Sequence, residues 1–238
     1  MTDEHQVLVS ASILNADFSR LDRVVHKMER AGVDRLHLDV MDGNFVDNIT
    51  FGPDVVAAFR RLTDMPLDVH LMISEPARYM DRFIAAGPQT ISFHVETDEG
   101  AGRKAEAIEA IHAAGQGAGL AVSPDTPVAA VSEWLDELDV IMIMSVYPGW
   151  GGQGFIPETA PKIAEARAML ASAGRGGLVH ADGGVNSKTA EIVGSHGIDV
   201  CIVGSALFQR GRDASDEVNL VKDLAGRGRE AFAASGAR

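Results

Sequence analysis

The strongest constraint on the fold is a strand-like segment followed by a helix-like segment, repeated eight times without a long linker. The strand-like segments are short and apolar, and they begin near residues 7, 35, 67, 90, 118, 140, 178 and 200. Apolar residues at helical spacing fill the intervals between them. Open doubly wound sheets usually have fewer strands, whereas eight such units in about 220 residues fit a closed (β/α)₈ barrel. We therefore predict an α/β fold, a TIM barrel.

We expect one domain over residues 1–238, with the barrel from about residue 7 to about residue 225. A helix is predicted over residues 18–29, with Asp17 as its N-cap, and another over residues 127–137. The last stretch, residues 226–238, is rich in Ala, Gly and Arg. We expect this C-terminal tail to fray.

The segment over residues 35–43 carries two different faces. Leu36, Leu38 and Val40 alternate with His37, Asp39 and Met41. A half-buried strand usually places Thr, Lys or Glu on its second face, so an imidazole and a carboxylate at the strand end indicate a site. An exposed polar face is the alternative explanation of this segment taken alone.

Two further strands end in the same kind of residue. His70 and Met72 close residues 67–72, and Asp182 closes residues 178–182. Because catalytic groups of a TIM barrel lie at the C-terminal ends of its strands, we expect His37, Asp39, His70 and Asp182 to converge. Two imidazoles and two carboxylates suit one divalent Zn, Fe, Mn or Co ion. A single histidine of this set would more often be a hydrogen-bonded core residue, so the prediction depends on the four together.

Three other residues on these strands receive no functional assignment. His94 and Glu96 share one face at the end of the strand that begins at residue 90. Their role stays open at this point. His180 lies two residues before Asp182 and therefore on the same face, and we interpret it as structural.

A glycine-rich loop follows the strand at residues 140–144. Residues 149–154 fit the pattern G-x-G-x-x-G, but the loop comes late in the chain, and the end of the next strand lies well beyond the spacing of about 20 residues at which a dinucleotide site places its acid. Phosphate binding by backbone N–H groups is the better interpretation. Glycines also end the next two strands, where such barrels often bind phosphate, at Gly183, Gly184 and Gly204, the last followed by Ser205. The alternative is that these glycines only form tight turns.

Composition excludes several classes of function. The formal net charge is −13, so we expect no basic surface for nucleic acid or anionic membrane. No apolar run is long enough to span a bilayer. Cys201 is the only cysteine, so the chain can form no internal disulfide. Because residues 1–5 do not resemble a signal peptide, we expect a cytoplasmic location.

Five motifs together resemble the ribulose-phosphate 3-epimerase family. They are residues 12–18 (SILNADF), 37–46 (HLDVMDGNFV), 67–72 (LDVHLM), 144–153 (MSVYPGWGGQ) and 182–185 (DGGV). The resemblance extends from about residue 7 to about residue 210. It implies a (β/α)₈ barrel that interconverts D-ribulose 5-phosphate and D-xylulose 5-phosphate by two-base proton transfer at C3 through an ene-diolate.

The resemblance also implies roles for individual residues. It makes His37, Asp39, His70 and Asp182 the metal ligands, with Asp39 and Asp182 also the catalytic acid/base pair. The implied substrate-binding residues are Ser12, His70, Gly151, Gly152, Gln153, Gly154, Gly183, Gly184, Gly204 and Ser205. The sulfurs of Met41, Met72 and Met144 would pack around the intermediate, the alternative being flexible filling of the core.

The chain departs from the family's usual residues at four positions, where it has Asp47, Tyr147, Trp150 and Ala181. Tyr147 and Trp150 belong to the glycine-rich loop near the substrate mouth, so they bear on which sugar binds. We therefore keep the 3-epimerisation of a hexulose phosphate such as D-allulose 6-phosphate as an alternative.

More distant alternatives are a metal-free phosphosugar lyase or decarboxylase and a non-catalytic phosphosugar-binding barrel. A Schiff-base aldolase would need a lysine at a strand end, and none of the five lysines lies in a predicted strand. The expected partners are a small phosphorylated ketose and further copies of the chain in a homo-oligomer.

Overall fold

The computed structural model describes residues 6–174 and 176–236, in which eight parallel strands form a closed barrel. Each strand pairs with the next in the chain, and β8 pairs with β1. The strands are β1 (Leu8–Ser12), β2 (Arg35–Met41), β3 (Leu67–Met72), β4 (Thr90–His94), β5 (Gly117–Val122), β6 (Val140–Met144), β7 (Leu178–Asp182) and β8 (Val200–Val203). The predicted TIM barrel is confirmed.

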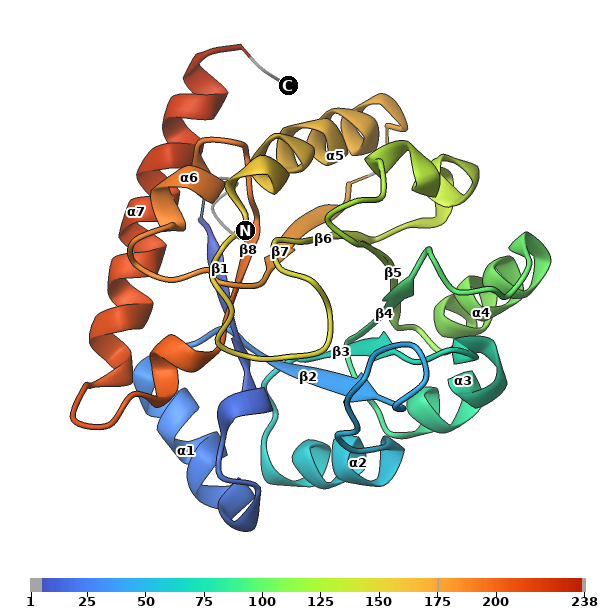
Figure 1. Cartoon of the computed structure of the whole chain (residues 1–238), viewed down its shortest axis with the longest axis horizontal. Helices are drawn as coiled ribbons and strands as arrows, with labels where there is room; N and C mark the ends of the chain where they lie inside the picture. The colour runs from blue at the N-terminus through green and yellow to red at the C-terminus, as the bar shows by residue number, and fades with distance from the viewer. Residues whose placement is uncertain (1–5, 175, 237–238) are drawn as a thin grey trace.

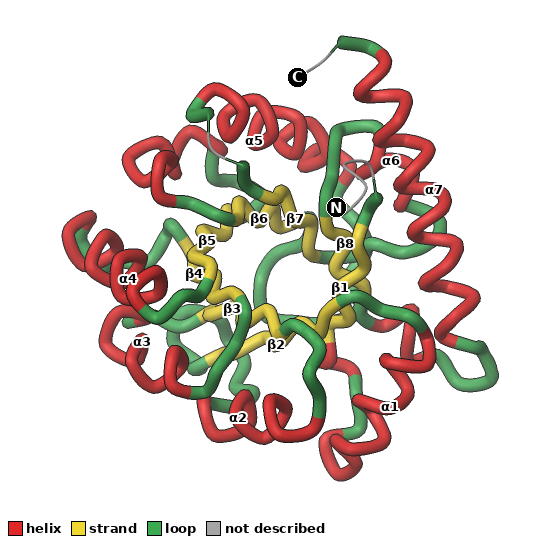
Figure 2. Tube along the Cα trace, turned by 180° about the vertical axis from the view of Figure 1, so that it is seen from behind, coloured by secondary structure: helices red, strands yellow, loops and turns green. Residues whose placement is uncertain are grey.

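Helices surround the ring of strands (Figures 1 and 2). They are α1 (Leu21–Ala31), α2 (Pro53–Leu62), α3 (Pro76–Ala85), α4 (Ala101–Ala113), α5 (Ala160–Ser172), α6 (Ala190–Gly194) and α7 (Ala214–Ala234), with the 3₁₀ helices η1 (Ile13–Asn15), η2 (Phe18–Arg20), η3 (Val128–Glu137), η4 (Pro157–Thr159) and η5 (Ser205–Phe208). Asp17 caps η2 by accepting from the backbone N–H of Ser19. The segment after Pro127 is a 3₁₀ helix. No helix in residues 6–174 or 176–236 is long and apolar enough to cross a membrane.

The C-terminal segment differs from the prediction of a frayed tail. α7 continues through Ala234, and only residues 237–238 of the tail lie outside the described residues. The glycines have a packing reason. A Cβ on Gly228 would lie 2.6 Å from the backbone nitrogen of Ser195, and one on Gly194 would lie 2.2 Å from the carbonyl oxygen of Ala225. Small residues therefore let α7 pack tightly on α6, and the composition that suggested fraying marks a close helix contact.

The side chains of β2 alternate between the two faces that the sequence predicts, one apolar and one that carries His37 and Asp39. Leu36, Leu38 and Val40 belong to the apolar core between the barrel and its helices, while His37 and Asp39 are also buried. Below the predicted site, the Asp68 carboxylate accepts hydrogen bonds from Ser10, Arg35 and Thr90. A smaller apolar cluster lies on β5, β6 and β8, which carry none of the predicted histidine ligands. It consists of Ala121, Val140, Met142, Met144 and Ile202. The interior thus combines a polar side and an apolar side.

Candidate metal centre and active-site pocket

Strand register brings the four predicted metal ligands together. Asp39 on β2 is the register partner of His70 on β3, and Ser12 on β1 is the partner of His37. Asp182 ends β7 and is the partner of Met144. One ligand atom from each of His37, Asp39, His70 and Asp182 lies within 4.8 Å of the other three. The convergence inferred from strand ends is therefore present in the structure.

Both imidazoles direct one ring nitrogen toward the two carboxylates. Nε2 of His37 lies 3.3 Å from Oδ1 of Asp39 and 3.8 Å from Oδ2 of Asp182. Nδ1 of His70 lies 3.2 Å from the same Asp39 oxygen and 3.5 Å from the same Asp182 oxygen. Ser12 donates its hydroxyl hydrogen to the other Asp39 oxygen, at 2.7 Å. Asp39 therefore has a fixed orientation, with one oxygen facing both histidines.

The electrostatics of this cluster favour a cation between the carboxylates. Burial alone would lower the pKa of His37, but Asp39 and then Asp182 raise that pKa to about 9. The pKa of His70 is also raised, because its bonds to Asp182 and Asp39 outweigh burial. Burial of Asp39 is likewise outweighed by His37 and His70, which hold its pKa well below the usual range. Without another cation, protons on the histidines supply the positive charge that the carboxylates need.

The residues fit a divalent metal ion. Both ring nitrogens of His37 are buried without a hydrogen-bond partner among the described residues, so its Nε2 is available as a ligand. Two imidazole nitrogens and two carboxylate oxygens are a donor set that transition metals accept, and the absence of thiolates argues against a purely structural zinc site. His37, Asp39, His70 and Asp182 would hold the ion.

The raised pKa of His37 predicts how the metal-free protein responds to pH. Between the ordinary pKa of 6.5 and the folded value of about 9, the folded state keeps a proton that the unfolded state has lost. The free energy of unfolding should therefore fall as pH rises through this range, by roughly 3 kcal/mol. Urea unfolding in the presence of excess chelator, at several pH values from about 6 to about 9.5, measures this change in the free energy of unfolding.

Replacing His37 by Gln provides the control for this pH dependence. The variant lacks the titrating imidazole, so its loss of stability over the same pH range should be much smaller. An equally steep loss in the wild type and in His37→Gln would show that another group is responsible.

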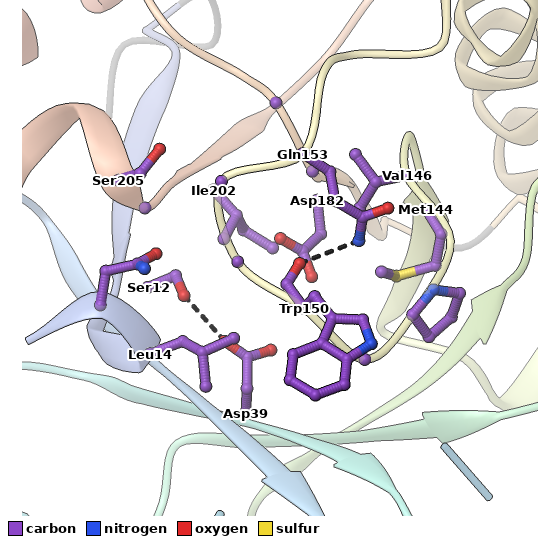
Figure 3. Close-up of a pocket in the computed structure, with 18 of the residues that line it drawn as sticks. Ser12, Leu14, Asp39, Met144, Val146, Trp150, Gln153, Asp182, Ile202 and Ser205 are labelled. Carbon is purple, nitrogen blue, oxygen red and sulfur yellow. Dashed lines mark hydrogen bonds between the residues drawn. The ribbon is translucent and has the colours of Figure 1, made fainter. Parts of the chain in front are cut away.

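A pocket opens above the four ligands at the C-terminal end of the barrel (Figure 3). The space above them amounts to about 620 Å³, part of which is open solvent. Its lining residues are Ser12, Leu14, Asn15, Asp39, Met41, Met72, Met144, Val146, Tyr147, Pro148, Gly149, Trp150, Gly151, Gly152, Gln153, Asp182, Gly183, Gly184, Val185, Asn186, Ile202, Gly204 and Ser205. A concave pocket on which a few polar side chains converge is the usual form of a small-molecule site.

Most of the predicted site residues line this pocket. All three predicted methionines do, together with Ser12, Asp39, Asp182 and most of the predicted phosphate-end residues. Gly154 does not line it, and His37 and His70 are fully buried below it. Direct contact between His70 and a substrate in this pocket would thus require the structure to rearrange.

The sequence interpretation missed several lining residues. Asn15 lies inside the quoted motif at residues 12–18, and Ile202 could have been found by alternation, since it precedes Gly204 by two positions on the β8 side. Leu14 lies inside the same motif and Pro148 inside the motif at residues 144–153, whereas Asn186 belongs to a connecting segment without a periodic pattern.

The two glycines after Asp182 are required by the path of the chain. Gly183 has φ of 117°, and a Cβ there would lie 2.8 Å from the backbone nitrogen of Val146. Gly184 has φ of 66°, and its Cβ would lie 2.4 Å from the backbone nitrogen of Phe155. The tight-turn explanation therefore holds for this pair, which also lines the pocket. The two interpretations are compatible, because a side chain absent for steric reasons also leaves the backbone open to a ligand.

The loop between β6 and α5 crosses the mouth of the barrel (Figure 1). Gln153 donates to the carbonyl oxygens of Tyr147 and Trp150, at 2.7 and 2.9 Å, and so closes the loop on itself. Tyr147 donates its hydroxyl hydrogen to Asp125, and Trp150 is 59% exposed at the pocket (Figure 3). Two of the four departures from the family's usual residues thus lie at the entrance.

The remaining histidines differ in their surroundings. His180 is buried on the barrel interior, and neither ring nitrogen has a hydrogen-bond partner among the described residues. Burial lowers its pKa to about 3, so it is neutral. His94 instead contacts both His70 and Glu96. Its position directly behind a predicted ligand was not apparent from the sequence.

Comparison with known proteins identifies relatives over most of the chain. A model of the ribulose-phosphate 3-epimerase family matches residues 8–208. Ribulose-phosphate 3-epimerase of Bacillus subtilis (strain 168) is 41% identical over 221 residues, which cover 92% of this chain and 99% of that protein. The chloroplastic ribulose-5-phosphate-3-epimerase of Arabidopsis thaliana is 42% identical over 218 residues, which cover 92% of this chain and 76% of that protein.

Solved structures of low sequence identity share the fold. 3-Hexulose-6-phosphate synthase superposes with a TM-score of 0.69 at 14% identity, covering 92% of this chain and 99% of that one. KGPDC from Streptococcus mutans superposes with a TM-score of 0.71 at 13% identity, covering 93% of this chain and 98% of that one. At this identity the likeness concerns the barrel alone.

Proposed function

The chain belongs to the ribulose-phosphate 3-epimerase family, and on that premise we propose that it interconverts D-ribulose 5-phosphate and D-xylulose 5-phosphate in a metal-dependent reaction. One observation carries the proposal beyond family membership. Two carboxylates and two buried imidazoles meet below a glycine-lined pocket. This arrangement suits the removal of a proton beside a carbonyl group, because it offers carboxylate bases and ligands for a charge-stabilising cation.

Asp39 and Asp182 are proposed as the two proton-transfer groups. They come from β2 and β7, which β1 and β8 separate in the barrel, and both carboxylates line the pocket. Inversion at C3 needs a base on one face of the carbon and an acid on the other, so one carboxyl group must be ionised while the other is protonated. The two exchange roles when the reaction runs in reverse.

The proposed cofactor is one Zn, Fe, Mn or Co ion held by His37, Asp39, His70 and Asp182. When bound, such an ion would supply positive charge where negative charge develops on the substrate oxygens as the ene-diolate forms. Ser12 holds Asp39 in place through its hydroxyl group. Met41, Met72 and Met144 surround the same space with polarizable, apolar groups.

The phosphate group is proposed to bind against Gly152, Gly184, Gly204 and Ser205. All four line the pocket, and no Lys or Arg does so among the described residues. Backbone N–H groups would then carry most of the binding, which accords with a chain of net charge −13. The absence of lysine also removes the Schiff-base aldolase as a candidate for this pocket.

The named activities of the relatives favour a pentulose phosphate over the hexulose alternative. Pocket volume does not separate the two, and the two departures from the family's usual residues at the entrance, Tyr147 and Trp150, line the same pocket. The family assignment likewise favours an epimerase over the lyase, decarboxylase and non-catalytic alternatives. The cytoplasmic location and the homo-oligomer stay predictions.

A coupled assay on D-ribulose 5-phosphate and D-allulose 6-phosphate tests the proposed substrate. We expect kcat/KM to be at least about tenfold higher for the pentulose phosphate, since one extra carbon must fit the same pocket. Inorganic phosphate should compete with either substrate. A preference for the hexulose phosphate would establish the alternative, and no turnover of either sugar by metal-loaded protein would contradict an epimerase.

A further inference from the structure

A second histidine stands directly behind one of the proposed metal ligands. The rings of His70 and His94 stack with centroids 5.0 Å apart and planes at 28°. Their Nε2 atoms are 3.0 Å apart, and both side chains are fully buried. Nδ1 of His70 faces the two carboxylates, so the two nitrogens of this ring have separate functions: one faces the metal site and the other faces His94.

Glu96 continues this chain of contacts away from the pocket. Its Oε2 lies 2.8 Å from Nδ1 of His94, and its Oε1 accepts the backbone N–H of Ser123 at 2.7 Å. The carboxyl group is ionised, because the hydrogen bond from His94 outweighs burial and lowers its pKa to about 2. An ionised carboxylate can only accept hydrogen bonds. Glu96 therefore requires the proton of His94 to be on Nδ1.

The position of that proton determines the next one. Nδ1 of His94 carries the hydrogen that Glu96 accepts, so in a ring with one proton Nε2 has a lone pair and acts as an acceptor. Nε2 of His70 must then donate. A neutral His70 with its proton on Nε2 has its other lone pair on Nδ1, the atom that lies 3.2 Å from Asp39 and 3.5 Å from Asp182. A lone pair facing two carboxylates is favourable only when a cation lies between them.

We propose that Glu96 and His94 are positioning residues that fix the ring orientation and tautomer of His70, so that its Nδ1 is presented to the metal ion. The inference rests on the proposed function, since it concerns the same metal site. Ligating histidines commonly donate the N–H of their second ring nitrogen to a carboxylate, a backbone carbonyl or water, and loss of such an acceptor weakens metal binding. Here the acceptor is a histidine, whose own acceptor state is set by the carboxylate beyond it.

Metal affinity is the measurement that tests the proposal. The dissociation constant for Zn²⁺ is determined by competition with a chromophoric chelator in the wild type and in the variants Glu96→Gln and His94→Phe. Both variants should bind Zn²⁺ about 10–100-fold more weakly. His94→Gln should recover part of the affinity, because its amide oxygen can accept from Nε2 of His70. Glu109→Gln, a change on the exposed surface of α4, is the matched control and should leave affinity unchanged.

The visible absorption of Co²⁺-loaded protein separates positioning from general support of the fold. The ligand-field bands should shift in Glu96→Gln and His94→Phe and stay constant in Glu109→Gln, whereas a purely structural role would lower only the melting temperature. Unchanged affinity and bands in folded variants would overturn the proposal and leave the metal site intact. A wild-type chain that binds no divalent ion would overturn the proposed metal site and this inference together.

Discussion

Stripping divalent metal from the wild-type protein should reduce epimerisation by at least about 1,000-fold, and one equivalent of metal per chain should restore it. The expectation follows from the convergence of His37, Asp39, His70 and Asp182 within 4.8 Å. A carboxylate alone is too weak a base for a carbon acid, and no Lys or Arg of the described pocket lining can neutralise the charge that develops on the substrate. Elemental analysis and activity are measured on the same samples.

Add-back experiments identify the metal. Zn, Fe, Mn and Co are supplied separately to stripped protein, and the melting temperature is recorded beside activity, because an ion that binds only the folded state also raises stability. His26→Gln, which changes a histidine on the exposed face of α1, controls for unspecific binding and should behave as the wild type. Full activity in protein without bound metal, unaffected by chelators, would contradict the assignment.

The fold and the ligand cluster could be predicted because both depend on local patterns. Alternation along residues 36–41 separates an apolar face from one that carries His37 and Asp39, and a parallel barrel places all strand ends at one rim. Four residues chosen by their position at strand ends therefore met in space. No knowledge of which strand lies beside which was needed beyond chain order.

Contacts that depend on register or on close packing could not be predicted in this way. Alternation put His94 and Glu96 on one face, but the contact of His94 with His70 depends on the offset between β3 and β4, where His70 pairs with Ser92. The continuation of the last helix beyond residue 226 was not predicted, for a related reason. Glycine has a low helix propensity, so Gly228 argues against a helix when the sequence is considered alone. The reason for glycine at this position is the close approach of the backbone at Ser195, at the end of the neighbouring helix.

Replacing either Asp39 or Asp182 by Asn should reduce epimerisation by about 10²–10⁴-fold or more, since each is proposed as an essential proton-transfer group. The two losses should differ in kind. A variant that lacks only the acid can still remove the substrate proton, so it should exchange substrate hydrogen with solvent deuterium without completing inversion. Because acid and base exchange roles with direction, the variant that shows exchange should change when the reaction starts from the other epimer. Proton NMR in D₂O measures exchange and epimerisation together.

Metal occupancy must be controlled in this experiment, because both carboxylates are also proposed ligands and their loss weakens binding. Each variant is therefore assayed with metal in excess and its bound metal measured. Asp42→Asn is the matched control: Asp42 follows β2 directly, but its carboxylate accepts from Ser74, Asn44 and Phe45 and does not line the pocket. Its amide oxygen can keep part of those bonds, so the control should stay active. If metal-loaded Asp39→Asn or Asp182→Asn epimerises at a near-normal rate in both directions, that residue transfers no proton and the two-base assignment is wrong.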